Sequence, residues 1–332
     1  AARLGYHILL EKPISPVPEE VYRIGKLAEG YDKVISICHV LRYTPFFKTI
    51  KKLLDEGKVG RLMTINHNEN VAYWFHTQNF VRGNWRSSKE TSPMILAKSC
   101  HDMDILLYLV GADCTRLSSF GNLSHFKAEN APKGAAKRCL DGCPYFDTCQ
   151  YNAVTICLNP EIPVRKSCKN SFNIEDTSDK SIINALKTNK YGRCVYYCDN
   201  DVVDHQVVNM EFENEVTAVF TMTGFTYDHS RTIKLMGTDG EIGGDLDRNE
   251  ITVKDFKTGA INRIVLPEPP SGHSGGDMGI VQSTINAIRG TGIDNSSAKV
   301  SVQSHMMAFA AEKSRIEGNT IDMKEYIDSF EK

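Results

Sequence analysis

The N-terminal part of the chain contains two short apolar runs separated by an amphipathic segment. Residues 7–10 and 34–38 are apolar runs, which are typical of parallel strands covered on both faces. Between these runs, apolar residues recur at helical spacing, at Val21, Ile24, Leu27 and Ala28. The pattern predicts a strand–helix–strand unit of a doubly wound parallel sheet. Because the first strand has almost no chain before it to pair with, we expect residues 1–43 to be the remnant of a larger α/β domain.

Residues 44–332 show a different order of elements. Helices are predicted near residues 46–54, 101–110, 278–288 and 302–310. Strands are predicted at 61–67 and repeatedly from residue 205 onward, joined by short turns, which favours an open and mainly antiparallel sheet with one covered face. The whole pattern predicts a truncated α/β domain followed by an α+β domain with an open sheet.

Two segments of this second part are predicted to be irregular. Residues 71–93 are polar and aromatic, and we expect them to form a long functional loop. Residues about 125–198 contain most of the cysteines and are predicted to be a loop-rich insertion.

The bulk properties exclude several classes of function. The chain has 332 residues and a formal net charge of −2, without a long basic run, so we expect no binding to nucleic acid or to an anionic membrane. Apolar stretches such as residues 105–110 are too short to span a bilayer. The first residues lack the basic-then-apolar pattern of a secretory signal. We therefore expect a cytoplasmic location, in which the ten cysteines stay reduced.

A series of short motifs runs through the chain in one order. They are GYHILLEKPIS, CHVLRYTPFF, LLDEGKVGRL, NWRSS, CHDMDILLYLVG, GTDGEIGGD and HSGGD. In this order and approximate spacing, the sequence resembles the Gfo/Idh/MocA oxidoreductases, the family of glucose–fructose oxidoreductase and inositol dehydrogenase. The resemblance runs from residue 1 to about the last helix, and the cysteine-rich insertion interrupts it.

The resemblance implies a Rossmann domain that binds NAD or NADP, then a substrate domain with an open sheet like those of glyceraldehyde-3-phosphate dehydrogenase and dihydrodipicolinate reductase. It also implies hydride transfer to or from a carbon of a sugar, cyclitol or related polyol. Residues 1–43 would then end the dinucleotide-binding domain, and residues 44–332 would bind substrate and form oligomers. The sequence lacks the glycine-rich turn that cradles a dinucleotide pyrophosphate, so we expect the chain alone to be inactive.

Lys12 and His101 are the predicted catalytic residues. Lys12 follows the first strand, at the end where open α/β sheets bind ligands, and its cation would stabilise a developing alkoxide. The resemblance places the Glu11-Lys12-Pro13 turn beside the nicotinamide and the substrate hydroxyl. An imidazole at His101 is suited to accept the hydroxyl proton. The alternatives are a surface lysine after a strand and a histidine that only caps a helix.

One departure from the family pattern concerns the residue four positions before His101. Relatives usually have an aspartate there, whereas this chain has Ala97, followed by Lys98. We expect His101 to act as the general base, assisted by Lys98.

Further residues are predicted to bind ligands. Arg42 is predicted to bind the cofactor, and the substrate-side candidates are Tyr43, Trp85, Arg86, Lys98, Asp104 and His273. Aromatic faces stack on sugar rings, and cationic side chains donate hydrogen bonds to hydroxyls or carboxylates. The alternative for His273 is a tight turn that needs only the glycines beside it.

Several cysteines of the insertion form a candidate metal site. Cys139, Cys143 and Cys149, with Cys157 or Cys168 as a fourth ligand, would suit tetrahedral zinc or, less favourably, an iron–sulfur cluster. Further partners are available at Cys194 and Cys198. The alternative is a set of reduced thiols without metal. In either case we expect the cysteines to staple the insertion and not to take part in catalysis.

Three functions remain open at this point. The first is a nicotinamide-dependent oxidoreductase of a sugar or polyol, and the second is a glycosidase of the same family that uses NAD transiently. The third is a non-catalytic binding or dimerisation module. We also expect a homo-oligomer, a dimer or tetramer, because sheets of this family pair face to face.

Overall fold

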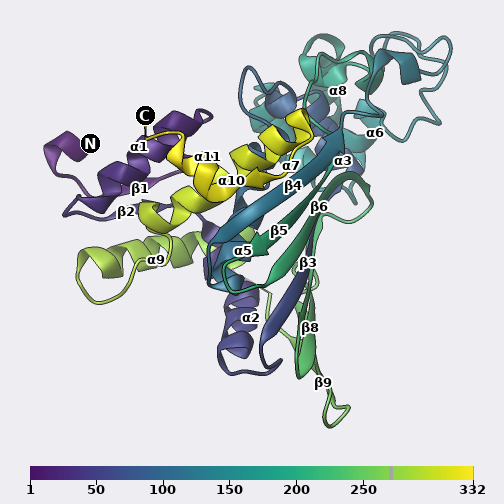
Figure 1. Cartoon of the computed structure of the whole chain (residues 1–332). Coiled ribbons are helices and arrows are strands. Elements are labelled where there is room, and N and C mark those ends of the chain that lie inside the picture. Colours follow the sequence, from purple (N-terminus) through teal and green to yellow (C-terminus); the bar gives the residue numbers. More distant parts are fainter. Residues whose placement is uncertain (269–271, 332) are drawn as a thin grey trace.

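The computed structural model describes residues 1–268 and 272–331 (Figure 1). Near the N-terminus, β1 (Ile8–Leu10) and β2 (Ile35–Ile37) pair in parallel, and α1 (Pro18–Glu29) connects them. This is the strand–helix–strand unit that the hydrophobic pattern predicts.

Helix α1 packs closely against the long helix α10 (Ala298–Glu317). A Cβ atom at Gly25 of α1 would stand 3.0 Å from the Val302 side chain of α10, so glycine permits the close approach of the two helices. Val21, on the same helix, is fully buried. Since α10 also packs against β4 and α5, it joins the N-terminal unit to the rest of the molecule.

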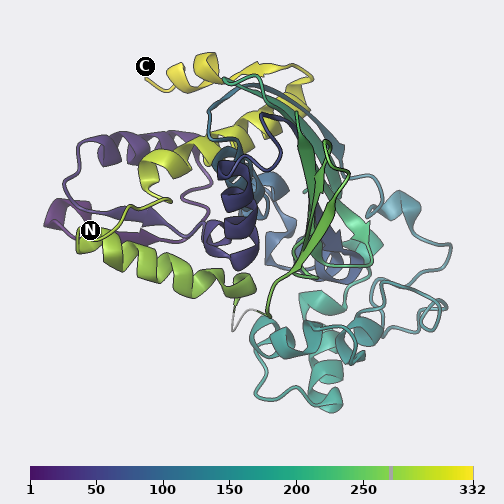
Figure 2. The same cartoon turned by 90° about the horizontal axis from the view of Figure 1, so that it is seen from below.

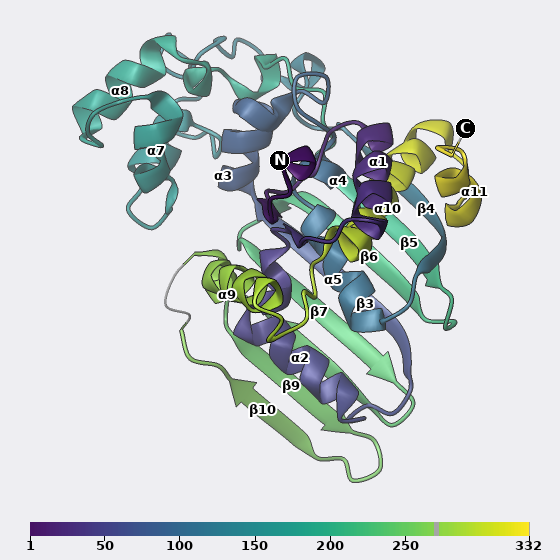
Figure 3. The same ribbon diagram turned by 90° about the vertical axis from the view of Figure 1, so that its left-hand side faces the viewer.

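The rest of the molecule is built on a nine-stranded sheet with the order β10-β9-β8-β7-β3-β6-β5-β4-β11 (Figure 3). The strands are β3 (Leu62–Ala72), β4 (Cys114–Asn122), β5 (His205–Phe212), β6 (Thr217–Thr226), β7 (Ser230–Gly237), β8 (Gly240–Asp245), β9 (Glu250–Asp255), β10 (Ile261–Val265) and β11 (Ile321–Asp322). Neighbouring strands are antiparallel except β3 and β6, which are parallel. The predicted open, mainly antiparallel sheet is confirmed.

Helices cover one face of this sheet (Figures 2 and 3). Besides α10, they are α2 (Pro45–Asp55), α4 (Met94–Ala97), α5 (Cys100–Val110) and α11 (Met323–Asp328), whereas α9 (Gly276–Ile288) packs against the 3₁₀ turn η2 (Val40–Tyr43). Burial alternates along the strands as expected for one covered face. On β6, for example, Phe220 is fully buried, whereas the next residue on the other face, Val219, is 36% exposed.

The predicted long loop at 71–93 is wrong in detail, because most of it is helical. Strand β3 continues to Ala72 and is followed by α3 (Tyr73–His76), the π-helical segment η3 (Thr77–Val81) and the 3₁₀ turn η4 (Asn84–Arg86). The polar residues His76 and Arg82 are buried here, at about 1% exposure each. Their burial depends on distant parts of the chain and left no apolar pattern in the sequence.

The insertion is also more regular than its sequence suggests. It contains α6 (Ala153–Leu158), α7 (Val164–Phe172) and α8 (Asp179–Thr188), and lies at one end of the sheet (Figure 1). These helices share a small apolar core of their own, which includes Ile156, Cys157, Cys168, Ile182 and Leu186. Among all the described residues, every helix falls short of the length and apolarity needed to cross a membrane.

Candidate active site

Lys12 follows the carboxyl end of β1, and two contacts fix the turn that carries it. The Lys12–Pro13 peptide bond is cis. Lys12 Nζ donates a hydrogen bond to the carbonyl oxygen of Ala97, at the end of α4, over 3.2 Å. The backbone N–H of Ile14 donates to Nε2 of His305 on α10 over 3.0 Å. The turn is therefore held between α4 and α10.

His101 lies in the first turn of α5 and is 5% exposed. Burial lowers its pKa well below the usual value, and the positive charge of Lys12 lowers the pKa further. His101 is therefore neutral at pH 7 and can accept a proton. Its Nδ1 atom is buried and has no hydrogen-bond partner among the residues that the structure describes. Because Lys12 Nζ bonds the carbonyl of Ala97, four residues before His101, the two predicted catalytic residues lie in the same part of the molecule.

The rings of two further histidines, His39 and His273, lie near the ring of His101. The ring centroid of His39, which precedes the 3₁₀ turn η2 (Val40–Tyr43), lies 5.7 Å from that of His101. The ring centroid of His273 lies 6.3 Å away. His273 is largely exposed and its Nδ1 lies 2.7 Å from a carboxylate oxygen of Asp277. Of the predicted substrate residues, His273 is thus one that the structure brings next to His101.

Lys98 belongs to a buried ionic network that the sequence reading missed. Lys98 Nζ lies 3.3 Å from the carboxylate of Glu69, and Arg231 contacts Glu69 at 2.6 Å and Asp102 at 2.8 Å. Nε2 of His67 lies 2.8 Å from Asp102. The cations Lys98 and Arg231 and the carboxylates Glu69 and Asp102 balance each other inside the protein. The two-residue alternation of buried positions along β3 could have indicated this network, because it turns His67 and Glu69 to the covered face of the sheet.

The network also shifts pKa values. Burial lowers the pKa of Lys98, although Glu69 opposes this shift. Burial raises the pKa of Asp102, but Arg231 and His67 outweigh it, so the pKa of Asp102 lies below its usual value. Asp102 is therefore ionised at pH 7. Lys98, three residues before His101, has a pKa below its usual value.

Arg42 and Asp104 pair with each other. Nε and Nη2 of Arg42 donate to the two carboxylate oxygens of Asp104 over 2.6 and 2.7 Å, and Nη1 donates to the carbonyl of Asn295 over 2.7 Å. Both side chains are buried, at 5% and 1% exposure. Because their charges are matched internally, they are placed to hold η2 and α5 together.

The other predicted substrate residues have separate surroundings. The hydroxyl of Tyr43 lies 3.0 Å from that of Ser296 and is buried. Arg86 binds both carboxylate oxygens of Asp199 over 2.9 Å, which ties η4 to the insertion. Trp85 is 38% exposed.

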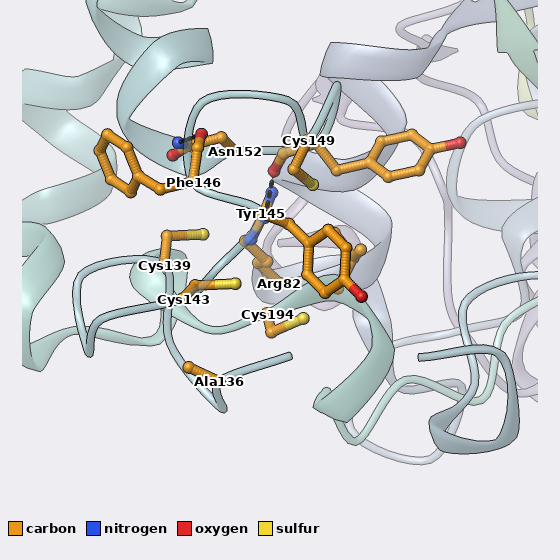
Figure 4. A pocket seen from close by; sticks show the side chains of 11 residues that line it. Arg82, Ala136, Cys139, Cys143, Tyr145, Phe146, Cys149, Asn152 and Cys194 are labelled. Atoms are coloured by element: carbon orange, nitrogen blue, oxygen red, sulfur yellow. Dashed lines mark hydrogen bonds between the residues drawn. The ribbon is translucent and has the colours of Figure 1, made fainter. Parts of the chain in front are cut away.

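Four cysteines line one small cavity in the insertion, and one predicted ligand is not among them. Cys139, Cys143, Cys149 and Cys194 surround the cavity (Figure 4). Cys157 is buried elsewhere, where a hydrogen bond with the Cys168 thiol raises its pKa. Over residues 1–268 and 272–331, no three His, Cys, Asp or Glu side chains are arranged to hold one metal ion. The predicted zinc site with Cys157 is therefore not supported.

The fold and the site now define a class of protein: an α/β protein with an open sheet, attached to a dinucleotide-type strand–helix–strand unit. The family model described as "Oxidoreductase family, C-terminal alpha/beta domain" matches residues 51–323. The chain belongs to this family, the Gfo/Idh/MocA oxidoreductases.

Curated relatives match in part. The chain is 28% identical over 114 residues to inositol 2-dehydrogenase from Corynebacterium glutamicum (strain R), covering 34% of this chain and 30% of that protein. It is 27% identical over 111 residues to D-xylose dehydrogenase from Paenarthrobacter nicotinovorans, covering 32% of this chain and 28% of that protein. These matches therefore span less than a third of each relative's length.

Solved structures match nearly the whole chain. The structure of levoglucosan dehydrogenase in complex with NADH and levoglucosan superposes with a TM-score of 0.67 and 16% sequence identity. The match covers 97% of this chain and 75% of that chain. At this identity, the likeness establishes the fold.

Proposed function

We propose that this chain is the substrate-binding part of an NAD- or NADP-dependent oxidoreductase acting on a sugar, cyclitol or related polyol. The family membership supports an oxidoreductase. The observation that carries the proposal is that Lys12 Nζ bonds the carbonyl of Ala97, four residues before the buried imidazole of His101. Residues 1–43 complete a dinucleotide-binding domain in this proposal, and residues 44–332 form the substrate domain with the insertion at about 125–198.

The two residues divide the work on a substrate hydroxyl. His101 accepts the hydroxyl proton because its depressed pKa keeps it neutral at pH 7. Lys12 places a positive charge beside the oxygen as it becomes an alkoxide. Ala97 contributes its backbone carbonyl, which holds Lys12 Nζ in position. This chain has Ala97 at the position where relatives usually have an aspartate. In this proposal His101 therefore acts as the general base, and Lys98 lies beside it.

The residues present also fit one edge of a nicotinamide cofactor. The turn Glu11-Lys12-Pro13 follows the carboxyl end of a parallel strand, the edge at which such sheets bind nucleotides. These three residues would border the nicotinamide, whereas Arg42, which we predicted to bind it, has its charge matched by Asp104. A bound nicotinamide supplies or takes the hydride.

Turnover assays test this proposal in protein that joins the chain to the proposed upstream nucleotide-binding segment. Reduction of NAD and NADP is measured with a panel of sugars and cyclitols, alongside glycosides. Lys12→Ala and His101→Ala should each lower kcat by about 10²–10⁴-fold, while Lys324→Ala, at an exposed lysine, should not. Unchanged turnover in both variants would overturn the site. Cleavage of glycosides without net cofactor reduction would indicate the glycosidase instead.

We also propose that the open face of the sheet pairs with a second copy of the chain. The uncovered face presents Phe120 at 65% exposure and Val219 at 36% exposure. The strand register places both on the same side of β4, β5 and β6, since Phe120 lies opposite Val207 and Val219 lies opposite Asn209. Exposed apolar residues on a sheet face are typical of an interaction surface.

A further inference from the structure

Four cysteines converge on one cavity although one of them is distant in the sequence. Cys139, Cys143 and Cys149 come from a single turn-rich segment before α6. Two backbone hydrogen bonds bring Cys194 beside Cys139: Cys139 N–H donates to Gly192 over 3.1 Å, and Cys194 N–H donates to Lys137 over 2.9 Å. This short ladder places the fourth thiol on the wall of the cavity that the other three also line (Figure 4).

A buried arginine lines the same cavity and has an unused donor. Arg82 is 1% exposed, and its Nε and Nη2 donate to the carbonyls of Arg193 and Tyr151 over 2.7 and 2.6 Å. Its Nη1 is buried and has no hydrogen-bond partner among the described residues. A buried cation with a free donor is costly unless an anion faces it. The cavity therefore favours an occupant with negative charge and hydrogen-bond acceptors.

One backbone N–H group already points at a sulfur of this set. The N–H of Ala153 donates to Sγ of Cys139 over 3.5 Å. Hydrogen bonds to sulfur are typical of thiolates that ligate metal, because the metal deprotonates the thiol and the N–H groups stabilise the charge.

The arrangement distinguishes a cluster from a single ion. Zinc requires four sulfurs about 2.3 Å from one point, and within the described part of the chain no three ligating side chains meet in that way. In a cubane iron–sulfur cluster, each thiolate binds a different iron, so the sulfurs stand farther apart around a central body. Such a cluster with four thiolates carries net negative charge, and its sulfides can accept a hydrogen bond from Arg82.

We propose that Cys139, Cys143, Cys149 and Cys194 bind an iron–sulfur cluster of the [4Fe–4S] type, with Arg82 as its buried counter-charge. The cluster joins the start of the insertion to its end and to the segment after η3. Tyr145, Phe146 and Val195 also line the cavity and limit the access of water to the cluster. The proposal does not depend on the oxidoreductase reaction.

Metal analysis of the protein tests the proposal directly. The protein is purified without oxygen, and a second sample is reconstituted with ferrous iron and sulfide. We expect about four iron atoms and four acid-labile sulfides per chain, with a visible charge-transfer band that dithionite bleaches. Stoichiometric zinc without iron would overturn the proposal, as would disulfides or a protein that takes up no iron under either condition.

Two serine variants then assign the ligands. Cys194→Ser should lose most of the iron and the visible band. Cys198→Ser is the matched control, because Cys198 is a partly exposed thiol four residues away that donates to the Cys194 carbonyl and does not line the cavity. We expect it to keep the full iron content. Equal loss or equal retention in the two folded variants would refute the ligand set, and far-UV circular dichroism shows that each is folded.

Discussion

A buried histidine on α10 supports the catalytic turn, and its substitution gives a quantitative test of the structure. His305 is fully buried, and its Nε2 accepts the hydrogen bond from the backbone N–H of Ile14. Because that N–H can only donate, Nε2 carries no proton, and Nδ1–H donates to the Ser301 carbonyl over 3.0 Å. Protonation of Nε2 would break the contact that holds the residue after Lys12-Pro13.

The pKa of His305 determines how this contact contributes to stability. Burial first, and then His39, lower the pKa of His305 from 6.5 to about 3. A histidine with a lowered folded-state pKa takes up its proton preferentially in the unfolded chain, so stability is lost as pH falls below 6.5. Between pH 7.5 and pH 5, this single group should cost about 2 kcal/mol.

Two substitutions isolate the effect. His305→Gln keeps an acceptor near the position of Nε2 and does not titrate. The free-energy difference between wild type and this variant, measured by urea unfolding, should therefore change by about 2 kcal/mol between pH 7.5 and pH 5, in favour of the variant at low pH. His305→Leu removes the acceptor, leaves the partly buried Ile14 N–H unpaired, and should cost about 1–3 kcal/mol more than glutamine at pH 7.5. A pH-independent difference, or equal stability of the two variants, would refute this reasoning.

Three further predictions concern other parts of the molecule. Arg231→Met leaves two buried carboxylates without their main counter-charge and should lower the free energy of unfolding by about 3–5 kcal/mol in urea titrations; a loss under 1 kcal/mol would contradict the network. Thr44→Ala removes the side chain that accepts the N–H of Phe47 at the start of α2, and should cost about 1 kcal/mol; the serine variant is its control. Phe120→Asp should shift the mass measured by light scattering from dimer or tetramer to monomer, and an unchanged mass would exclude the open face as the interface.

The sequence predicted those parts of the fold that local patterns encode. Continuous apolar runs indicated β1 and β2, and two-residue alternation indicated the strands from residue 205 onward. The parallel pairing of β3 with β6 could not be predicted this way, because pairing between distant strands leaves no periodic signal in either of them. The helices at 73–86 were missed because their buried side chains include polar residues such as Arg82, which donates to the carbonyls of the distant residues Tyr151 and Arg193.

The same limit applies to the candidate site. Lys12 and His101 were predicted because each stands at the end of a recognisable element, and their catalytic roles stay a prediction. Arg231 was missed since it is one of many charged residues on a strand, and only the fold shows that it faces Glu69 and Asp102. Cys194 was considered only as a further partner because its approach to Cys139 depends on a backbone ladder between segments that lie about 55 residues apart.

The central claim is that the ammonium group of Lys12 faces the buried imidazole of His101. The most direct test is the pKa of His101, measured by following its ring carbon signals by NMR as a function of pH in wild type and in Lys12→Met. The account predicts that His101 stays neutral well below pH 6.5 in wild type and that its pKa rises in the variant, because one of the charges that depress it is gone. An identical titration curve in the two proteins would contradict the claim.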